Sequence, residues 1–191
     1  MSRFSLASIT ICLALVAGSG CATGAGAPGA PGELARLQPL EPRGPGAVFA
    51  TVDSAALDGL LLAYLESEKS DRPSRRLARG STVFPVEGGY SYSPLATADP
   101  DQPGRVPLVL KPGDVAHFHT YPRGSSRINR INEKHSPNDR ANVDRRDPLK
   151  RPSFVLTPSL RVQRYDGRSS EKLVARIDPQ APGVVVAQVD R

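Results

Sequence analysis

The clearest pattern of hydrophobic and polar positions lies between residues 53 and 69, in DSAALDGLLLAYLESEK. Large apolar side chains recur there at intervals of three and four residues, which is the spacing of one stripe along an amphipathic helix. These residues are Leu57, Leu60, Leu61, Tyr64 and Leu65. Asp53 or Ser54 is expected to cap the first turn. We therefore predict a helix over 53–69 that packs one face against a core.

Beyond residue 80 the pattern changes to short apolar or alternating runs separated by Pro and Gly, which is typical of strands. The predicted strands are 81–86, 89–94, 106–110, 114–120, 152–157, 160–165, 172–177 and 183–189. The segment SFVLTPSLRVQRYD predicts a hairpin that turns at Pro158-Ser159. One long helix packed on a mixed or mostly antiparallel sheet indicates the α+β class.

The N-terminus has the features of a bacterial export signal. Arg3 provides a short basic start, and an apolar run follows from Ile9 to Ala17. This run is about half the roughly 20 residues that a transmembrane helix needs, so we expect residues 1–20 to be a cleaved signal peptide. Small residues precede Cys21, as in a lipoprotein signal, with Gly18 at the position that usually holds Leu. An ordinary signal peptide cleaved nearby is the alternative.

Lipidation of Cys21 would leave no unpaired thiol in the exported chain, because Cys12 lies in the part that is removed. Acyl chains on Cys21 would attach the protein to a lipid bilayer. We expect a bacterial cell-envelope location, with the outer membrane favoured over the inner membrane because Ala22, not Asp, follows the cysteine. Residues 21–47, which are rich in Ala, Gly and Pro, are predicted to form a tether. Residues 48–191 then form one globular domain.

The positive charge of the chain is concentrated in one segment. The formal net charge is +6, and residues 123–164 contain 11 Arg or Lys against 4 Asp or Glu. Such a run is most often a solvated face. The alternative is an anionic or protein partner bound at 123–164. Nucleic acid is not an expected partner, because export separates the protein from it and no nucleic-acid-binding motif accompanies the charge.

Two of the three histidines flank one phenylalanine in the segment DVAHFHT, residues 114–120. Side chains alternate along a strand, so His117 and His119 share one face while Phe118 points to the other. Two imidazoles at this spacing, about 7 Å apart, are within reach of one metal ion. Taken alone, this spacing favours two polar residues on a strand over a metal site.

Two further motifs contain residues suited to chemistry. Ser136-Pro137-Asn138-Asp139 has the order of a capping box, with Ser at the N-cap, Pro at the first position and an acid at the third. Glu87 follows an apolar strand and precedes two glycines, so it is either an acid held near the sheet or an exposed turn residue.

In this order, Glu87, His117-x-His119 and Ser136-x-x-Asp139 after an amphipathic helix resemble the JAB/MPN (JAMM) zinc metallopeptidase family. The segments EGGYSYS, HFHT, HSPNDRANVDR and SFVLTPSLRVQRYD resemble most closely the uncharacterised JAB-like domain of bacterial secreted proteins and Rhs-type polymorphic toxins. The resemblance covers about 50–168 and implies a JAB/MPN-like α+β fold with a short helix at the Ser136 motif.

The resemblance also implies roles for the matching residues. His117, His119 and Asp139 would bind one zinc ion, Glu87 would be the general base, and Ser136 would stabilise an oxyanion. The implied activity is a peptidase or isopeptidase reaction in which a zinc-activated water attacks an amide. A toxin-like effector would be a variant of this activity.

The sequence departs from the family pattern between the histidines and the serine. The gap between His119 and Ser136 holds the basic insert YPRGSSRINRINEKH, which is longer than in typical members. His135 is interpreted as a surface histidine, with a fourth metal ligand as the alternative. Two other functions remain open: a cupin-like metal site, and a non-catalytic envelope lipoprotein that uses the JAB-like fold as a binding or scaffolding module.

Overall fold

The computed structural model describes residues 41–69, 76–167, 171–178 and 185–187. The predictions for the signal peptide, for Cys21 and for most of the tether concern residues outside these ranges. Helices and strands pack into an α+β domain, so the predicted class is confirmed. Within the described ranges, no helix is both long and apolar enough to span a membrane.

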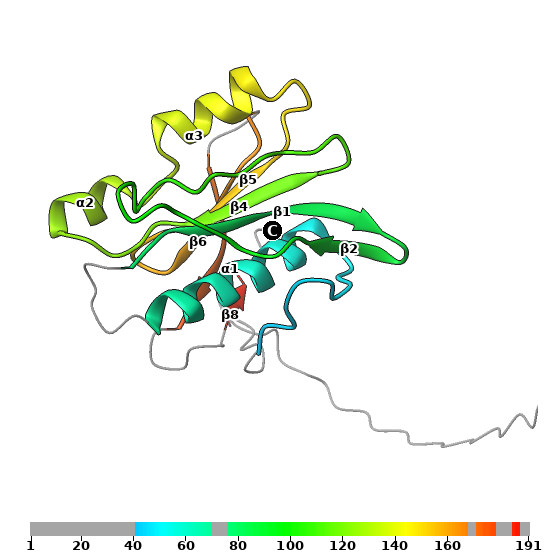
Figure 1. The fold of residues 1–191 in the computed structure, drawn as a ribbon, viewed down its shortest axis with the longest axis horizontal. Coiled ribbons are helices and arrows are strands. Elements are labelled where there is room, and N and C mark those ends of the chain that lie inside the picture. Colours follow the sequence, from blue (N-terminus) through cyan, green and yellow to red (C-terminus); the bar gives the residue numbers. More distant parts are fainter. Residues whose placement is uncertain (1–40, 70–75, 168–170, 179–184, 188–191) are drawn as a thin grey trace, which may run out of the picture. The chain divides into compact units, whose positions relative to one another are not determined.

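The helices are α1 (Val52–Glu68), α2 (Ser126–Ile131) and α3 (Pro137–Ala141), and α3 continues into a π-helical turn over Asn142–Arg146. The strands are β1 (Arg79–Val86), β2 (Gly89–Tyr92), β3 (Ala96–Thr97), β4 (Ala116–Thr120), β5 (Ser153–Leu156), β6 (Arg161–Tyr165), β7 (Lys172–Ile177) and β8 (Val185–Ala187). Together they form one sheet (Figure 1).

The sheet is antiparallel except at its centre. Its order is β2-β1-β4-β5-β6-β7-β8, with β3 paired to β1, and β4 and β5 form the one parallel pair among the described strands. A parallel pair needs a long crossover. Residues 121–152 provide it and include α2 and α3. Figure 1 shows α1 on one side of the sheet and α3 on the other.

Helix α1 begins slightly earlier than the sequence pattern predicts. Thr51 is the N-cap, and its hydroxyl accepts a hydrogen bond from the Ser54 backbone N–H at 3.1 Å. The Ser54 side chain accepts from the Thr51 N–H at 3.2 Å, which completes a capping box. The predicted cap at Asp53 or Ser54 is therefore wrong, because Ser54 is the third residue of the helix and takes part from that position.

The closest contact between α1 and the sheet depends on a glycine. Gly59 of α1 lies over the ring of Phe118 in β4, and a Cβ at this position would stand 2.2 Å from a ring carbon. Phe118 is fully buried together with Leu60, Phe154 and Val162. The absence of a side chain at Gly59 thus allows the helix to pack directly on the central strand.

The predicted strand at 106–110 is wrong. Residues 105–111 carry no strand pairing, and Leu108 N–H donates to the carbonyl of Val106 at 2.9 Å. Pro107 has no N–H to contribute to a ladder, which disfavours pairing at this point. The hydrophobic run is therefore a loop segment that lines a cleft, and it is not part of the sheet.

The described end of the predicted tether is attached to the domain. The backbone N–H groups of Arg43 and Gly44 donate to the two carboxylate oxygens of Asp58 in α1, at 2.8 and 3.1 Å. Phe49 exchanges backbone hydrogen bonds with Tyr90 of β2. Residues 43–49 therefore contact both α1 and the sheet.

Candidate functional site

The two histidines of β4 point away from α1 and line a cleft of about 950 Å³. Because side chains alternate along the strand, Phe118 enters the core while His117 and His119 face the opposite side. The neighbouring strands place Thr82 and Ser153 opposite His117 and place Gly80 opposite His119. Both histidines are 7% exposed, so they are nearly buried at the floor of the cleft.

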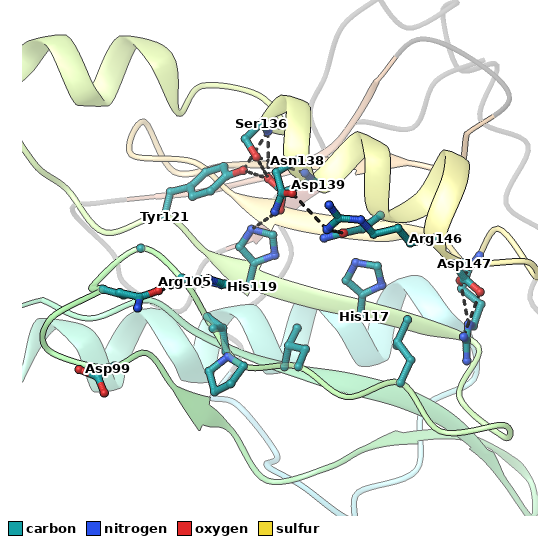
Figure 2. Close-up of a pocket in the computed structure, with 18 residues that line it drawn as sticks. Asp99, Arg105, His117, His119, Tyr121, Ser136, Asn138, Asp139, Arg146 and Asp147 are labelled. Carbon is teal, nitrogen blue, oxygen red and sulfur yellow. Dashed lines mark hydrogen bonds and ion pairs between the residues drawn. The ribbon is translucent and has the colours of Figure 1, made fainter.

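Three parts of the chain form the walls around these histidines (Figure 2). Residues 99–110 form one wall, α3 with its π-helical turn forms the opposite wall, and Tyr121, directly after β4, lies at one end. Figure 2 shows Asp139 above His119 and Arg146 above His117, while Asp99 lies at the far end. The sheet and the crossover thus bring together residues that are more than 20 positions apart in the sequence.

Asp139 is held in place by the start of α3 and by Tyr121. Its Oδ2 accepts hydrogen bonds from the Ser136 backbone N–H at 3.0 Å, from the Ser136 hydroxyl and from the Tyr121 hydroxyl. The Tyr121 oxygen in turn accepts from the Ser136 N–H at 3.0 Å. Oδ2 is therefore fully used by these donors, and Oδ1 is the oxygen that faces His119.

The protonation states of these groups suit metal binding. Burial lowers the pKa of His117 from 6.5 to about 4, assisted by the nearby His119. Burial likewise lowers the pKa of His119, and Asp139 opposes that shift. Burial acts to raise the pKa of Asp139, but His119 and the hydrogen bonds from Ser136 and Tyr121 outweigh it, so the pKa is lowered. At neutral pH the site presents two neutral imidazoles and one carboxylate, the forms that metals bind.

The separation of His119 from Asp139 is informative. His119 Nε2 lies 3.7 Å from Asp139 Oδ1, which is too long for a hydrogen bond. Two ligands of a tetrahedral zinc ion, each about 2.1 Å from the metal, stand about 3.4 Å apart. His117 contributes a buried Nδ1 with no hydrogen-bond partner. Among the residues that the structure describes, however, no three His, Cys, Asp or Glu side chains are grouped closely enough to hold a metal ion.

The structure does not bring Glu87 to the histidines. Glu87 is exposed in the turn between β1 and β2, followed by Gly88 at φ +81°, and it does not line the cleft. In β1 the residue opposite His117 is Thr82, and Glu87 lies five residues further along the hairpin. At about 3.3 Å per residue this corresponds to roughly 16 Å. A carboxylate at that distance does not reach a water molecule held beside His117.

Ser136 does reach the site, but its hydroxyl is already engaged. The O–H donates to Asp139 Oδ2, and the same oxygen accepts from the Asp139 backbone N–H at 3.2 Å. A serine has one hydroxyl hydrogen, so stabilising an oxyanion would require Ser136 to release Asp139. In this arrangement Ser136 positions the carboxylate.

The interpretation of His135 as a surface residue is wrong, since its side chain is fully buried. Its Nε2 lies 3.0 Å from the carbonyl oxygen of Ser153, to which it donates, and its Nδ1 lies 3.2 Å from Glu171 Oε1. Burial lowers the pKa of His135 to about 4, assisted by His119. His135 does not line the cleft and instead ties the start of α3 to β5 and Glu171.

Tyr121 is a site residue that the sequence motifs did not identify, although the sequence contains a signal for it. Tyr121 follows His119 by two residues, so it continues the alternation of His117 and His119 on the same face of the chain. Its ring packs edge-on against His119, with 5.0 Å between ring centroids. Burial, together with the adjacent Asp139, raises its pKa, so the hydroxyl remains a hydrogen-bond donor at neutral pH.

No family model matches the chain, and searches of curated proteins and of solved structures return no match.

Proposed function

We propose that this chain is a cell-envelope lipoprotein with a JAB/MPN-like zinc-dependent hydrolase domain that acts on an amide bond. The observation that carries the proposal is the 3.7 Å separation between His119 Nε2 and Asp139 Oδ1 at the floor of the cleft. The order of the elements also supports it: α1, then β1 and β2, then the histidine strand β4, then Asp139 at the start of α3.

In this proposal His119 and Asp139 provide two ligands of one zinc ion, and His117, on the same face of β4, would complete the set by closing on the metal when it binds. Bound zinc would lower the pKa of a water molecule to about 7 and polarise a substrate carbonyl. The Ser136 and Tyr121 donors keep Asp139 ionised and aim Oδ1 into the cleft. The walls formed by residues 99–110 and by the π-helical turn would hold the substrate over the histidines.

The proposal also includes attachment to a lipid bilayer through an acylated Cys21. We propose an outer-membrane attachment from the residues around the cysteine, with the Ala/Gly/Pro-rich tether predicted over residues 21–47 as the connection to the domain. Replacing Cys21 by Ser should move the chain from the membrane fraction to the soluble fraction. A Cys21→Ser chain that stays with the membrane would contradict lipid attachment and would leave the zinc proposal untouched.

The zinc proposal is tested by measuring the metal content of the full chain, purified in a non-ionic detergent without chelators and then supplied with zinc. We expect about one zinc per chain, and we expect His119→Ala and Asp139→Asn to lose it. Asp99→Asn is the matched control, because Asp99 lines the far end of the same cleft. Absence of zinc from the unmodified chain would overturn the proposal.

Turnover is then tested with envelope peptides as substrates for the zinc-loaded chain. Hydrolysis should disappear in His119→Ala and persist in Glu87→Gln, because Glu87 is exposed and distant from the histidines. If Glu87→Gln retained zinc but lost hydrolysis, the role implied for Glu87 by the family resemblance would be correct after all.

A second function is a non-catalytic binding or scaffolding module. The positions and partners of the carboxylates that line the cleft favour it. In the part of the chain that the structure describes, no carboxylate that lines the cleft is available beside the histidines as a general base. Asp139 faces His119, Asp147 is paired with Arg151, and Asp99 lies at the far end. A zinc-loaded chain that binds envelope peptides without cleaving them would establish this function.

A further inference from the structure

The three arginines that line the cleft differ in what neutralises their charge. Arg151 is paired with Asp147, since its Nε and Nη2 donate to the two carboxylate oxygens at 2.8 and 2.9 Å. Its Nη1 donates to the carbonyl of Lys111 at 2.8 Å. Burial acts to raise the pKa of Asp147, but the hydrogen bonds from Arg151 outweigh it and lower the pKa. Arg151 is therefore a structural cation, because its charge is paired with Asp147 and its remaining nitrogen, Nη1, is used by the carbonyl of Lys111.

Arg146 is held in place by neutral groups, and within the described ranges it forms no ion pair with a carboxylate. Its Nη1 donates to the side-chain oxygens of Asn142 at 2.8 Å and Asn138 at 3.3 Å. Both acceptors are neutral amides of the same helical segment. Figure 2 shows the Arg146 side chain reaching over His117 toward Asp139. The guanidinium is thus oriented into the cleft by groups that leave its positive charge uncompensated.

Arg105 provides a similar cation on the other wall. Its Nη1 donates to the amide oxygen of Gln102 at 3.3 Å, which is again a neutral acceptor. Arg105 and Arg146 come from walls on either side of the histidines. Since arginine presents a planar set of donors that matches a carboxylate, two such groups define a site for an anion.

We propose that the cleft binds a peptide that carries a free carboxylate close to its reactive amide, with Arg146 as the principal carboxylate-binding residue and Arg105 as the second. This inference names the substrate class, and it rests on the proposed hydrolase function in one respect. The peptide is a substrate only if the chain hydrolyses it, whereas binding of its carboxylate does not depend on hydrolysis. The carboxylate would lie on the Arg146 side, because Asp99 at the far end repels an anion there. Arg146 would then hold the amide over His117 and His119.

The test compares two probes that differ by one charge: N-acetyl-alanyl-alanine as the free acid, and the same dipeptide as its C-terminal amide. Binding to the full chain in non-ionic detergent is measured by isothermal titration with a chelator present, so that no metal contributes. We expect the acid to bind at least about ten-fold more tightly than the amide, as expected for a charge-assisted hydrogen bond. Equal affinities, including no binding of either probe, would overturn the inference.

Arg146→Gln should weaken binding of the acid about ten-fold and leave binding of the amide unchanged. Arg145→Gln is the matched control, because Arg145 is an exposed arginine of the same helical turn that does not line the cleft. Arg105→Gln should cause a smaller loss for the acid. An equal loss in the Arg145 and Arg146 variants would show that general charge, and not this site, attracts the probe.

The outcome is independent of the zinc measurement. If zinc binds with the expected ligands but the acid and the amide bind alike, the carboxylate inference fails and the proposed function stands. If no zinc binds but Arg146 discriminates between the two probes, the proposed function fails and the cleft remains a carboxylate-binding site.

Discussion

The two faces of β4 are buried to nearly the same extent but are packed very differently. Phe118 is fully buried against Gly59 and the core, and its ring has apolar neighbours on each side. His117 and His119 are 7% exposed on the other face, where His117 Nδ1 has no hydrogen-bond partner. Buried polar atoms normally have partners. The phenylalanine face is therefore packed as core, whereas the histidine face leaves a buried polar atom available to a ligand, as the zinc proposal requires.

The largest expected effect on stability comes from truncating Phe118 on the face of β4 that packs against the core. Phe118→Ala should lower the free energy of unfolding by about 3–5 kcal/mol, because it leaves a cavity beneath α1. His119→Ala should cost less stability and should abolish zinc binding. Urea unfolding and zinc titration of both variants check this contrast. If His119→Ala were the more destabilising change, the histidine face would be part of the core.

The glycine contact sharpens the same prediction. Gly59→Ala should destabilise the chain, because the new Cβ would overlap the ring of Phe118. In a Phe118→Leu background the same change should be better tolerated, because the ring atoms involved in the overlap are absent. Additive losses in the double variant would contradict the direct contact.

The next largest effect is a loss of stability in acid, from the histidine face. The pKa of His117 is lowered from 6.5 to about 4 by burial, so the unfolded chain binds more protons than the folded chain between these values. Stability should therefore fall as the pH drops from 6.5 to 4, by on the order of 3 kcal/mol for this residue. Urea unfolding of the zinc-free chain across this range measures the loss.

His117→Asn should remove part of this acid sensitivity, whereas the contribution of His135, which has a pKa lowered to about 4, should remain. A free energy of unfolding that does not change between pH 6.5 and 4 would show that the histidines are not buried in their neutral form.

The smallest expected effect on stability comes from replacing Tyr121, which positions Asp139. Tyr121→Phe removes one hydrogen bond to Asp139 and one acceptor for Ser136, with an expected loss of about 1–2 kcal/mol. The same change should raise the pKa of Asp139 and weaken zinc binding about 10- to 100-fold. Tyr165→Phe is the control, since the Tyr165 hydroxyl donates to Asp144. Similar zinc affinities in the two variants would contradict the role of Tyr121.

Local patterns predicted most of the secondary structure because they depend on neighbouring residues. Apolar spacing predicted α1, and alternation predicted the central strands and the β5–β6 hairpin. The same reasoning failed at 106–110, where Pro107 interrupts pairing, and at the start of α1, where Thr51 and Ser54 share the cap. Strand pairing and reciprocal caps depend on contacts that residue spacing alone does not show.

The site was predicted in part for a similar reason. Alternation placed His117 and His119 on one face, and the Ser136 motif was expected to start a helix with Asp139 in its first turn. The position of Glu87 depended on the register of the β1–β2 hairpin, and the burial of His135 depended on the path of the crossover. Tyr121 was within reach of the sequence, because it continues the alternation of the two histidines.

By itself, the sequence determined the α+β class, the amphipathic helix, the shared face of the two histidines and the capping box that presents Asp139. The helix, the shared histidine face and the capping box arise from residue spacing within one helix turn or one strand. They therefore do not depend on where the segment lies in the fold. The tertiary structure alone decided that Asp139 Oδ1 stands 3.7 Å from His119, that Glu87 lies outside the cleft and that Arg146 faces it. Those distances depend on how the crossover packs over the sheet, which is set by contacts among residues far apart in the chain.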